Sequence, residues 1–190
     1  MPSVVEIVNR ALISIGSSPI IDLAQAGKAA ESAAAIWPQV RDDVLRSHPW
    51  NSCKSRQTIA ELGTAPVFGW AHQYQLPADC LRVIAVNGQS WPTDGWEIEG
   101  RVVLTHEGSP LELEYIRREE DANVYDAELV TALAARLAAE LATALSALGS
   151  ISDRAERRAE LAVMKARITD GIEEELVEDD LNDSWLAVRF

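Results

Sequence analysis

The chain has 190 residues, 47% of them hydrophobic and 25% charged, and its 30 acidic against 17 basic residues give a formal net charge of −13. This length and composition fit one globular domain with room for an inserted or appended subdomain. A surface of this sign repels phosphates and anionic membranes, which argues against a protein that binds nucleic acid electrostatically.

Residues 4–15 repeat apolar side chains at helical spacing and predict the first helix. Ser3 and Glu6 form a candidate capping box before it, and Gly16 is a candidate stop after it. Charged residues within this segment and the lack of a basic leader argue against a signal peptide. No apolar run approaches the length of a membrane span, so we expect a protein without a membrane partner.

A second helix is predicted from residue 29 to residue 46, with an apolar stripe formed by Ala33, Trp37, Val40 and Val44. Pro38 lies inside this pattern, so either one helix is kinked or a second helix begins there. The helix is expected to end at the segment SHPWN. Arg41 and Trp50 are the expected structural anchors of the exit from this helix.

From residue 58 to residue 117 the sequence consists of short runs of strand-forming residues that are separated by turn residues. In the last of these runs, one face carries the apolar side chains of Leu111, Leu113 and Tyr115. Asn87-Gly88 and Glu99-Gly100 are candidate hairpin turns. Because loops this short exclude parallel crossovers, we expect one small antiparallel sheet of four or five strands.

A third helix is predicted from Asp126 onward. Its long aliphatic side chains form a stripe of Val130, Leu133, Leu137, Leu141, Leu145 and Leu148. Nine alanines from Ala127 to Ala147 give the other side of the helix small side chains. Small side chains allow a neighbouring helix to approach closely, so we expect this alanine face to contact a sister copy.

A fourth helix is expected to begin at Asp153, which with Glu156 resembles a capping box. Its apolar residues at three- and four-residue steps are Leu161, Met164, Ile168, Ile172 and Leu176. The segment RAERRAE is expected on the solvent side, and the third and fourth helices are expected to form an antiparallel hairpin.

The C-terminal segment combines an acidic run with an apolar end. Residues 173–183 hold seven acids and no base, which indicates either a solvated segment or one that becomes ordered on a partner. Five of the last six residues are candidate docking residues, namely Trp185, Leu186, Val188, Arg189 and Phe190. This end either folds back on the body or docks on another chain.

The sequence contains no recognisable catalytic, cofactor or metal motif. His48, His72 and His106 share no ligand spacing, and Cys53 and Cys80 belong to no CxxC pattern, so reduced thiols and no metal site are expected. The tryptophans are a stronger indication of a functional surface. Large aromatic side chains in turn-rich segments commonly mark contact surfaces, and three tryptophans lie in such segments: Trp70, Trp91 and Trp96. We therefore expect no enzyme activity and no cofactor.

Six segments, taken in order, resemble the tail tubular protein A family of short-tailed bacteriophages, whose members are head-to-tail adaptors. RDDVLRSHPWN and YQLPADCLRV are the most specific of the matching stretches. The six segments are VNRALISIGSSPI, WPQVRDDVLRSHPWNSCKSR, YQLPADCLRVIAVNG, WEIEGRVVLTHEG, LELEYIRRE and LAARLAAELATAL. The resemblance covers nearly the whole chain, although the β region is shorter than in the long family members.

The resemblance implies an α+β protein that forms a dodecameric ring below the portal and joins it to the tail tube or nozzle. Double-stranded DNA would pass through the ring without specific binding, and the protein would be found in the virion neck or tail and in the host cytoplasm during assembly. It also implies a structural β corner, which comprises Tyr74, Leu76, Pro77, Asp79 and Leu81. In that corner Pro77 would fix the bend, Asp79 would cap the local turn, and Leu81 and Val83 would enter the core.

The predicted fold class is thus α+β, a bundle of about four helices with an inserted antiparallel β subdomain and an extended tail. The expected divisions are 1–57 for the first helices, 58–120 for the β subdomain, 121–178 for the helical hairpin and 179–190 for the docking tail. The expected function is a structural adaptor. The alternatives are an acidic helical cytosolic protein that binds and inhibits a basic partner, and an enzyme that uses a pair of acids.

Overall fold

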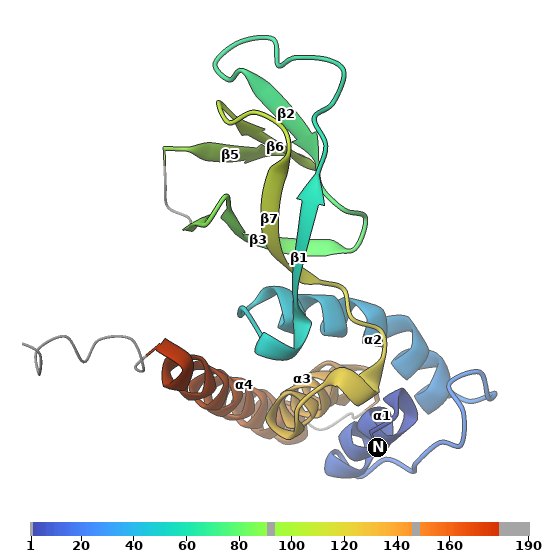
Figure 1. Cartoon of the computed structure of the whole chain (residues 1–190). Helices are drawn as coiled ribbons and strands as arrows, with labels where there is room; N and C mark the ends of the chain where they lie inside the picture. Colours follow the sequence, from blue (N-terminus) through green and yellow to red (C-terminus); the bar gives the residue numbers. More distant parts are fainter. Residues whose placement is uncertain (1, 91–93, 146–148, 179–190) are drawn as a thin grey trace, which may run out of the picture. The chain divides into compact units, whose positions relative to one another are not determined.

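The computed structural model describes residues 2–90, 94–145 and 149–178, with side chains described as far as residue 173. The fold is α+β, as the sequence predicts (Figure 1). The chain divides into two compact units, a helical unit of Met1–Val44 with Asp121–Phe190 and a β unit of Leu45–Glu120. The β unit is therefore inserted between the second and third helices.

Within the described residues four α-helices form: α1 (Val4–Ser14), α2 (Lys28–Arg46), α3 (Ala127–Leu145) and α4 (Gly149–Glu178). In the helical unit α3 packs along α4 and against α1. Two ion pairs join α3 to α4, Glu128 with Lys165 at 2.9 Å and Arg136 with Glu156 at 2.6 Å. The residue near the start of α3 thus pairs with the later residue of α4, and the residue further along α3 pairs with the earlier one. The two helices are therefore antiparallel, as predicted.

The ends of α1 follow the sequence signals. The Glu6 amide donates to the Ser3 hydroxyl oxygen at 3.2 Å, and the Ser3 amide donates to the Glu6 carboxylate at 2.8 Å, which completes the capping box. At the other end Gly16 has a φ of +79°, a conformation that favours glycine. The predicted start and stop of this helix are both confirmed.

The second helix is one continuous α2 with Pro38 inside it. Of the two alternatives that the sequence left open, a break into two helices is therefore wrong. The expected stripe is buried along its length, at Ala33, Trp37, Val40 and Val44. Burial of this stripe stabilises the helix and offsets the backbone hydrogen bond that proline cannot donate.

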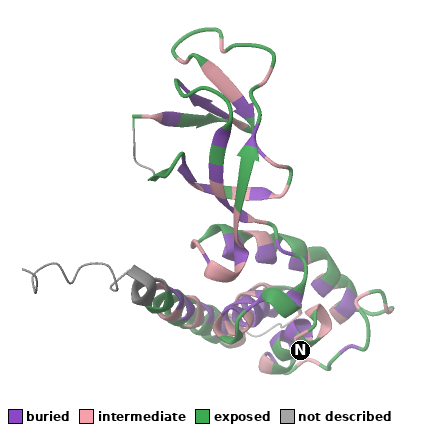
Figure 2. Ribbon diagram, viewed as in Figure 1, coloured by how far each residue is buried: buried purple, intermediate pink, exposed green. Residues whose placement is uncertain are grey.

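Helix α3 is buried on more than one side (Figure 2). The leucines at 129, 133, 137 and 141 are fully covered. The alanines are covered as well, at positions Ala132, Ala134, Ala135, Ala138, Ala139 and Ala142. The expectation that the alanine face contacts a sister copy is therefore wrong, because small side chains let other elements of the same chain approach closely.

Helix α4 differs from the prediction at its start and in its packing face. It begins at Gly149, so Asp153 lies inside the helix and is not its cap. Among the residues of α4 up to 173, the buried positions are Ala155, Ala159, Ala166 and Asp170, two of them from the segment expected on the solvent side. The aliphatic stripe faces solvent instead, with Leu161, Met164, Ile168 and Ile172 exposed. Two helices that meet through alanines pack closely and leave larger side chains outside.

The β unit contains seven strands in the part of the chain that is described: β1 (Lys54–Ile59), β2 (His72–Gln75), β3 (Cys80–Val86), β4 (Gln89–Ser90), β5 (Trp96–Glu99), β6 (Val102–Thr105) and β7 (Leu111–Arg117). They form two antiparallel sheets, ordered β1-β7-β3-β4 and β2-β6-β5. The prediction of one sheet with four or five strands is wrong. Short 3₁₀ helices, Asn51–Cys53 and Ala122–Val124, flank the strands.

Strand β1 is absent from the prediction, which placed the first β-type residue at 58. Its residues Lys54–Ile59 are mostly polar and only Ile59 is buried, so the strand shows no apolar alternation. It forms by pairing with β7, in a register that matches Lys54 with Ile116 and Ile59 with Leu111. A division between residues 57 and 58 would cut this strand, whereas the compact units divide between Val44 and Leu45.

The hairpin turns match the sequence more closely. Asn87 and Gly88 join β3 to β4 with φ values of +47° and +76°, which is the conformation of a type I′ turn. Gly100, at φ +58°, lies between the paired residues Glu99 and Val102 of β5 and β6. The core of the β unit combines residues of both sheets: Ile59, Tyr74, Leu76, Cys80, Val83, Val86, Trp96, Val103, Leu111, Leu113 and Tyr115.

Candidate interaction surfaces

The predicted β corner is a hydrogen-bonded turn between β2 and β3. Tyr74 and Leu76 are buried before it, and the Cys80 amide donates to the Pro77 carbonyl oxygen at 3.0 Å. The Arg118 amide, just after β7, donates to the Asp79 carbonyl oxygen at 2.7 Å. The turn is thereby tied to the end of β7, and its groups serve the packing of the β unit.

Two details of this corner differ from the expectation. The Asp79 carboxylate accepts from the Tyr115 hydroxyl at 3.4 Å, so its contact is with β7 and not with the local turn. Leu81 is only partly buried. The pairing of β3 with β7 shifts register between Cys80 and Arg82, and as a result the Cys80 side chain, and not that of Leu81, points into the core.

Burial of Tyr115 raises the pKa of its hydroxyl, which stays protonated at neutral pH.

Cys80 is 6% exposed. Burial raises the pKa of its thiol to about 11, and the nearby positive charge of Arg101 only partly opposes this shift. At neutral pH the side chain is therefore a neutral thiol, a form that is a weak nucleophile. Cys53, the other cysteine, is buried as well and forms no disulfide.

Arginine side chains hold the corner through backbone carbonyl groups. Arg101 donates to the carbonyl oxygen of Cys80 at 3.4 Å and also to that of Pro77. Arg46 donates to the carbonyl oxygen of Leu81. Both arginines line an open groove of about 610 Å³ together with Arg82. Since two of these three cations bind the protein's own backbone, the groove is a structural feature of the corner.

The two expected anchors of the α2 exit lie in different compact units. Arg41 is buried in α2 and forms an ion pair with Asp42 at 2.9 Å. Trp50 is fully buried, and its ring meets that of His48 edge to face, with centroids 4.7 Å apart. Each residue is thus part of the packing of its own unit.

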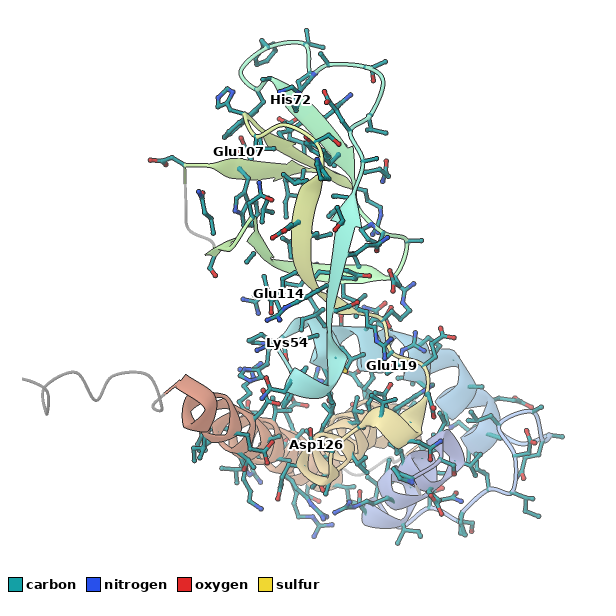
Figure 3. The ribbon with its side chains drawn as sticks, viewed as in Figure 1. Lys54, His72, Glu107, Glu114, Glu119 and Asp126 are labelled. Atoms are coloured by element: carbon teal, nitrogen blue, oxygen red, sulfur yellow. The ribbon has the colours of Figure 1, made fainter. Side chains whose placement is uncertain are left out.

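The remaining histidines lie on the β unit, apart from one another. His72, labelled in Figure 3, contacts Glu61 at 2.7 Å, and His106 lies against the ring of Trp70 with centroids 4.9 Å apart. The Trp70 indole also donates to Glu97 at 3.3 Å. No three metal-ligating side chains of the described residues gather in one place.

The three tryptophans that were expected at contact surfaces have different environments. Trp96 is 4% exposed and donates from its indole to the Gln89 carbonyl oxygen at 2.9 Å, so it belongs to the core and the expectation is wrong there. Trp70 is partly exposed beside His106. Trp91 lies outside the described residues.

The structure exposes two groups of apolar side chains that the sequence did not mark as surfaces. The first, which we call the α4 stripe, consists of Leu161, Met164, Ile168 and Ile172, at 53–62% exposure. The second, the β-unit loop tip, consists of Val67 and Phe68, at 96% and 86% exposure between β1 and β2. A signal for the tip was present in the run APVFG, where apolar residues stand between Pro66 and Gly69.

The predicted docking residues at the C-terminus, Trp185, Leu186, Val188, Arg189 and Phe190, lie outside the described residues, as does Leu148 of the predicted leucine stripe. The described helices include none that is long and apolar enough to cross a bilayer. Comparison with protein-family models and with curated proteins found no match to this chain.

Proposed function

We propose that this protein is a structural adaptor of a phage virion, which forms a ring on the portal and joins it to the tail tube or nozzle. The observation that carries the proposal is that each compact unit exposes an apolar surface of its own. The helical unit exposes the α4 stripe and the β unit exposes the loop tip. A connecting protein needs separate contact surfaces for separate partners.

The chemistry of the β corner supports the same reading. Cys80 is a neutral buried thiol, and the arginines around it donate to backbone carbonyl groups. These groups therefore act as structural parts of the β unit, and the proposal assigns no catalytic role to them. The resemblance of the sequence to head-to-tail adaptors adds the ring, the portal and the tail as partners.

The net charge of −13 suits a protein that lets DNA pass. Acidic side chains near a channel repel phosphates, so a moving genome meets few sites that retain it. In this proposal the DNA is cargo of the assembly, and it is not a specific ligand of the chain.

The test mixes the purified chain with the portal protein of the same genome and images the mixture by negative-stain electron microscopy. We expect rings seated on one end of the portal. A chain that forms no complex with the portal but binds a basic protein one-to-one would support the inhibitor alternative and reject the adaptor.

The loop tip has its own test within this assembly. Val67→Ser combined with Phe68→Ser should abolish binding to the portal or to the tail protein, because the tip loses most of its apolar surface. Ile98→Ser is the matched control, since Ile98 is an apolar residue of the same unit with 40% exposure. Equal binding by the loop variant and the control would reject the role of the tip.

A further inference from the structure

The turn between β3 and β4 contains the one place in this sequence where asparagine is followed by glycine, Asn87-Gly88. The side-chain amide of asparagine is chemically labile, and glycine has no side chain that shields its backbone nitrogen. Both residues are exposed, so water reaches them. The pair therefore places an electrophilic amide carbon, Cγ of Asn87, next to an unshielded nitrogen.

Two hydrogen bonds hold Asn87 on strand β7. Its backbone amide donates to the Glu112 carbonyl oxygen at 2.9 Å, and its Oδ1 accepts from the Glu112 amide at 2.9 Å. The second bond polarises the side-chain carbonyl group, because an N–H donor on a carbonyl oxygen draws electron density from the carbon. When a nucleophile adds to Cγ, the same N–H is in place to stabilise the negative charge that develops on Oδ1.

Gly88 is held less firmly than its neighbour. Its amide donates no hydrogen bond within the described residues, and a Cβ added at this position would meet nothing within 4 Å. Beyond the turn, the β3–β4 hairpin consists of two residue pairs, Val86 with Gln89 and Ala85 with Ser90. A hairpin this short gives its turn little resistance to rearrangement. The nitrogen can therefore move toward Cγ while Cγ stays in place.

We propose that Asn87 is a site of spontaneous deamidation in the folded protein. The backbone nitrogen of Gly88 bonds to Cγ of Asn87, and the side-chain nitrogen leaves as ammonia, which takes up the proton that the Gly88 nitrogen gives to water. The product is a cyclic succinimide. One water molecule then opens the ring, at the side-chain carbonyl to leave aspartate or at the backbone carbonyl to leave isoaspartate. Overall, water is consumed and ammonia is released.

The two products have different effects on the β unit. An aspartate at position 87 adds a negative charge but keeps the backbone, and its carboxylate still accepts from the Glu112 amide. An isoaspartate adds a carbon to the backbone of the turn. Because a type I′ turn joins its strands through two residues of fixed geometry, the longer backbone does not fit the pairing of Val86 with Gln89. Isoaspartate should therefore release β4 from β3.

Peptide mapping by mass spectrometry tests the proposal on the full chain after prolonged incubation at neutral pH. We expect aspartate and isoaspartate at position 87, formed at a rate within about tenfold of the rate in urea. Asn51 and Asn123 are the internal controls, because serine and valine follow them and shield the backbone nitrogen. These two residues should be modified at least about tenfold more slowly than Asn87.

Two substitutions test the roles of the two residues. Asn87→Gln should abolish the modification, because the longer side chain would have to close a larger ring. Gly88→Ala should slow it at least about tenfold, because the methyl group shields the nitrogen. Gly108→Ala is the matched control, since Gly108 is an exposed glycine of the same unit with open space around it, and it should leave the rate unchanged.

A native chain that converts Asn87 more than about tenfold more slowly than the chain in urea would overturn the proposal, and would show that the turn protects the residue. Equal modification of Asn51 or Asn123 would overturn it as well. If Asn87→Gln leaves the same amount of isoaspartate in this peptide, the reaction belongs to another residue. None of these results depends on a portal, so they are separable from the adaptor tests.

Discussion

Arg101 joins the turn between β2 and β3 to the hairpin between β5 and β6. Its guanidinium donates to the Pro77 and Cys80 carbonyl oxygens, while its own carbonyl oxygen accepts from the Leu76 amide at 2.9 Å. These hydrogen bonds satisfy backbone groups at the edge of the core, where an unpaired carbonyl is unfavourable. The corner is therefore held by a side chain that comes from outside the segment YQLPADCLRV, which contains the corner.

Arg101→Ala should lower the free energy of unfolding by roughly 1–2 kcal/mol, because the Cys80 and Pro77 carbonyl oxygens each lose a hydrogen bond from the guanidinium, although the Pro77 oxygen keeps that of the Cys80 amide. Urea unfolding followed by circular dichroism measures this change. Arg56→Ala is the control, since the Arg56 side chain is 83% exposed and its ion pair with Glu114 at 3.4 Å should contribute at most about 0.5 kcal/mol. Equal effects of the two substitutions would contradict the structural role of Arg101.

Cys80 should be unreactive in the folded protein. Because burial raises the pKa of its thiol to about 11, almost no thiolate is present at pH 8. Labelling with a thiol-reactive chromogenic disulfide should be slow in the native protein and fast in urea. Rapid labelling of Cys80 in the native protein would show that the thiol is accessible and ionised.

The raised pKa of the Cys80 thiol also affects the stability of the protein at high pH. The folded pKa of Cys80, about 11, lies above the ordinary value of 9.0, so the native state holds the proton more tightly than the unfolded state. This contribution to stability is present in full below pH 9 and is lost as the pH rises from 9 through 11. Cys80→Ala should therefore lose less stability than the natural chain over that interval.

At the scale of elements, the start of α3 is fixed by one side chain. The Asp126 carboxylate accepts from the amides of Glu128 and Leu129, each at 2.8 Å (Figure 3). Asp126→Ala should lower the free energy of unfolding by about 1 kcal/mol. Asp153→Ala is the matched control because Asp153 lies inside α4, and it should be neutral or slightly stabilising. A larger loss from Asp153→Ala would contradict the observed start of α4.

Elements with local signals could be predicted from the sequence. The capping box of α1 and the Asn87-Gly88 turn depend on neighbouring residues alone. Strand β1 could not be found, because its polar residues are held by pairing with β7, far away in sequence. The packing face of α4 was predicted wrongly, since periodicity locates an aliphatic stripe but does not reveal that the partner helix packs through its alanines.

At the scale of the whole molecule, the candidate surfaces were harder to predict than the fold class. The sequence suggested docking through the C-terminal residues and the alanine face of α3. The structure covers that alanine face and exposes the α4 stripe and the loop tip instead. Which surface remains free depends on which faces pair inside the chain, and this is a property of tertiary packing.

We propose that copies of this chain assemble as a ring on a portal. Mass photometry of the chain mixed with the portal tests it most directly, because each bound copy adds 20.8 kDa. The account predicts one dominant complex whose added mass corresponds to a dodecameric ring. A portal that gains no mass, or only that of a single copy, at saturating chain concentration would contradict it.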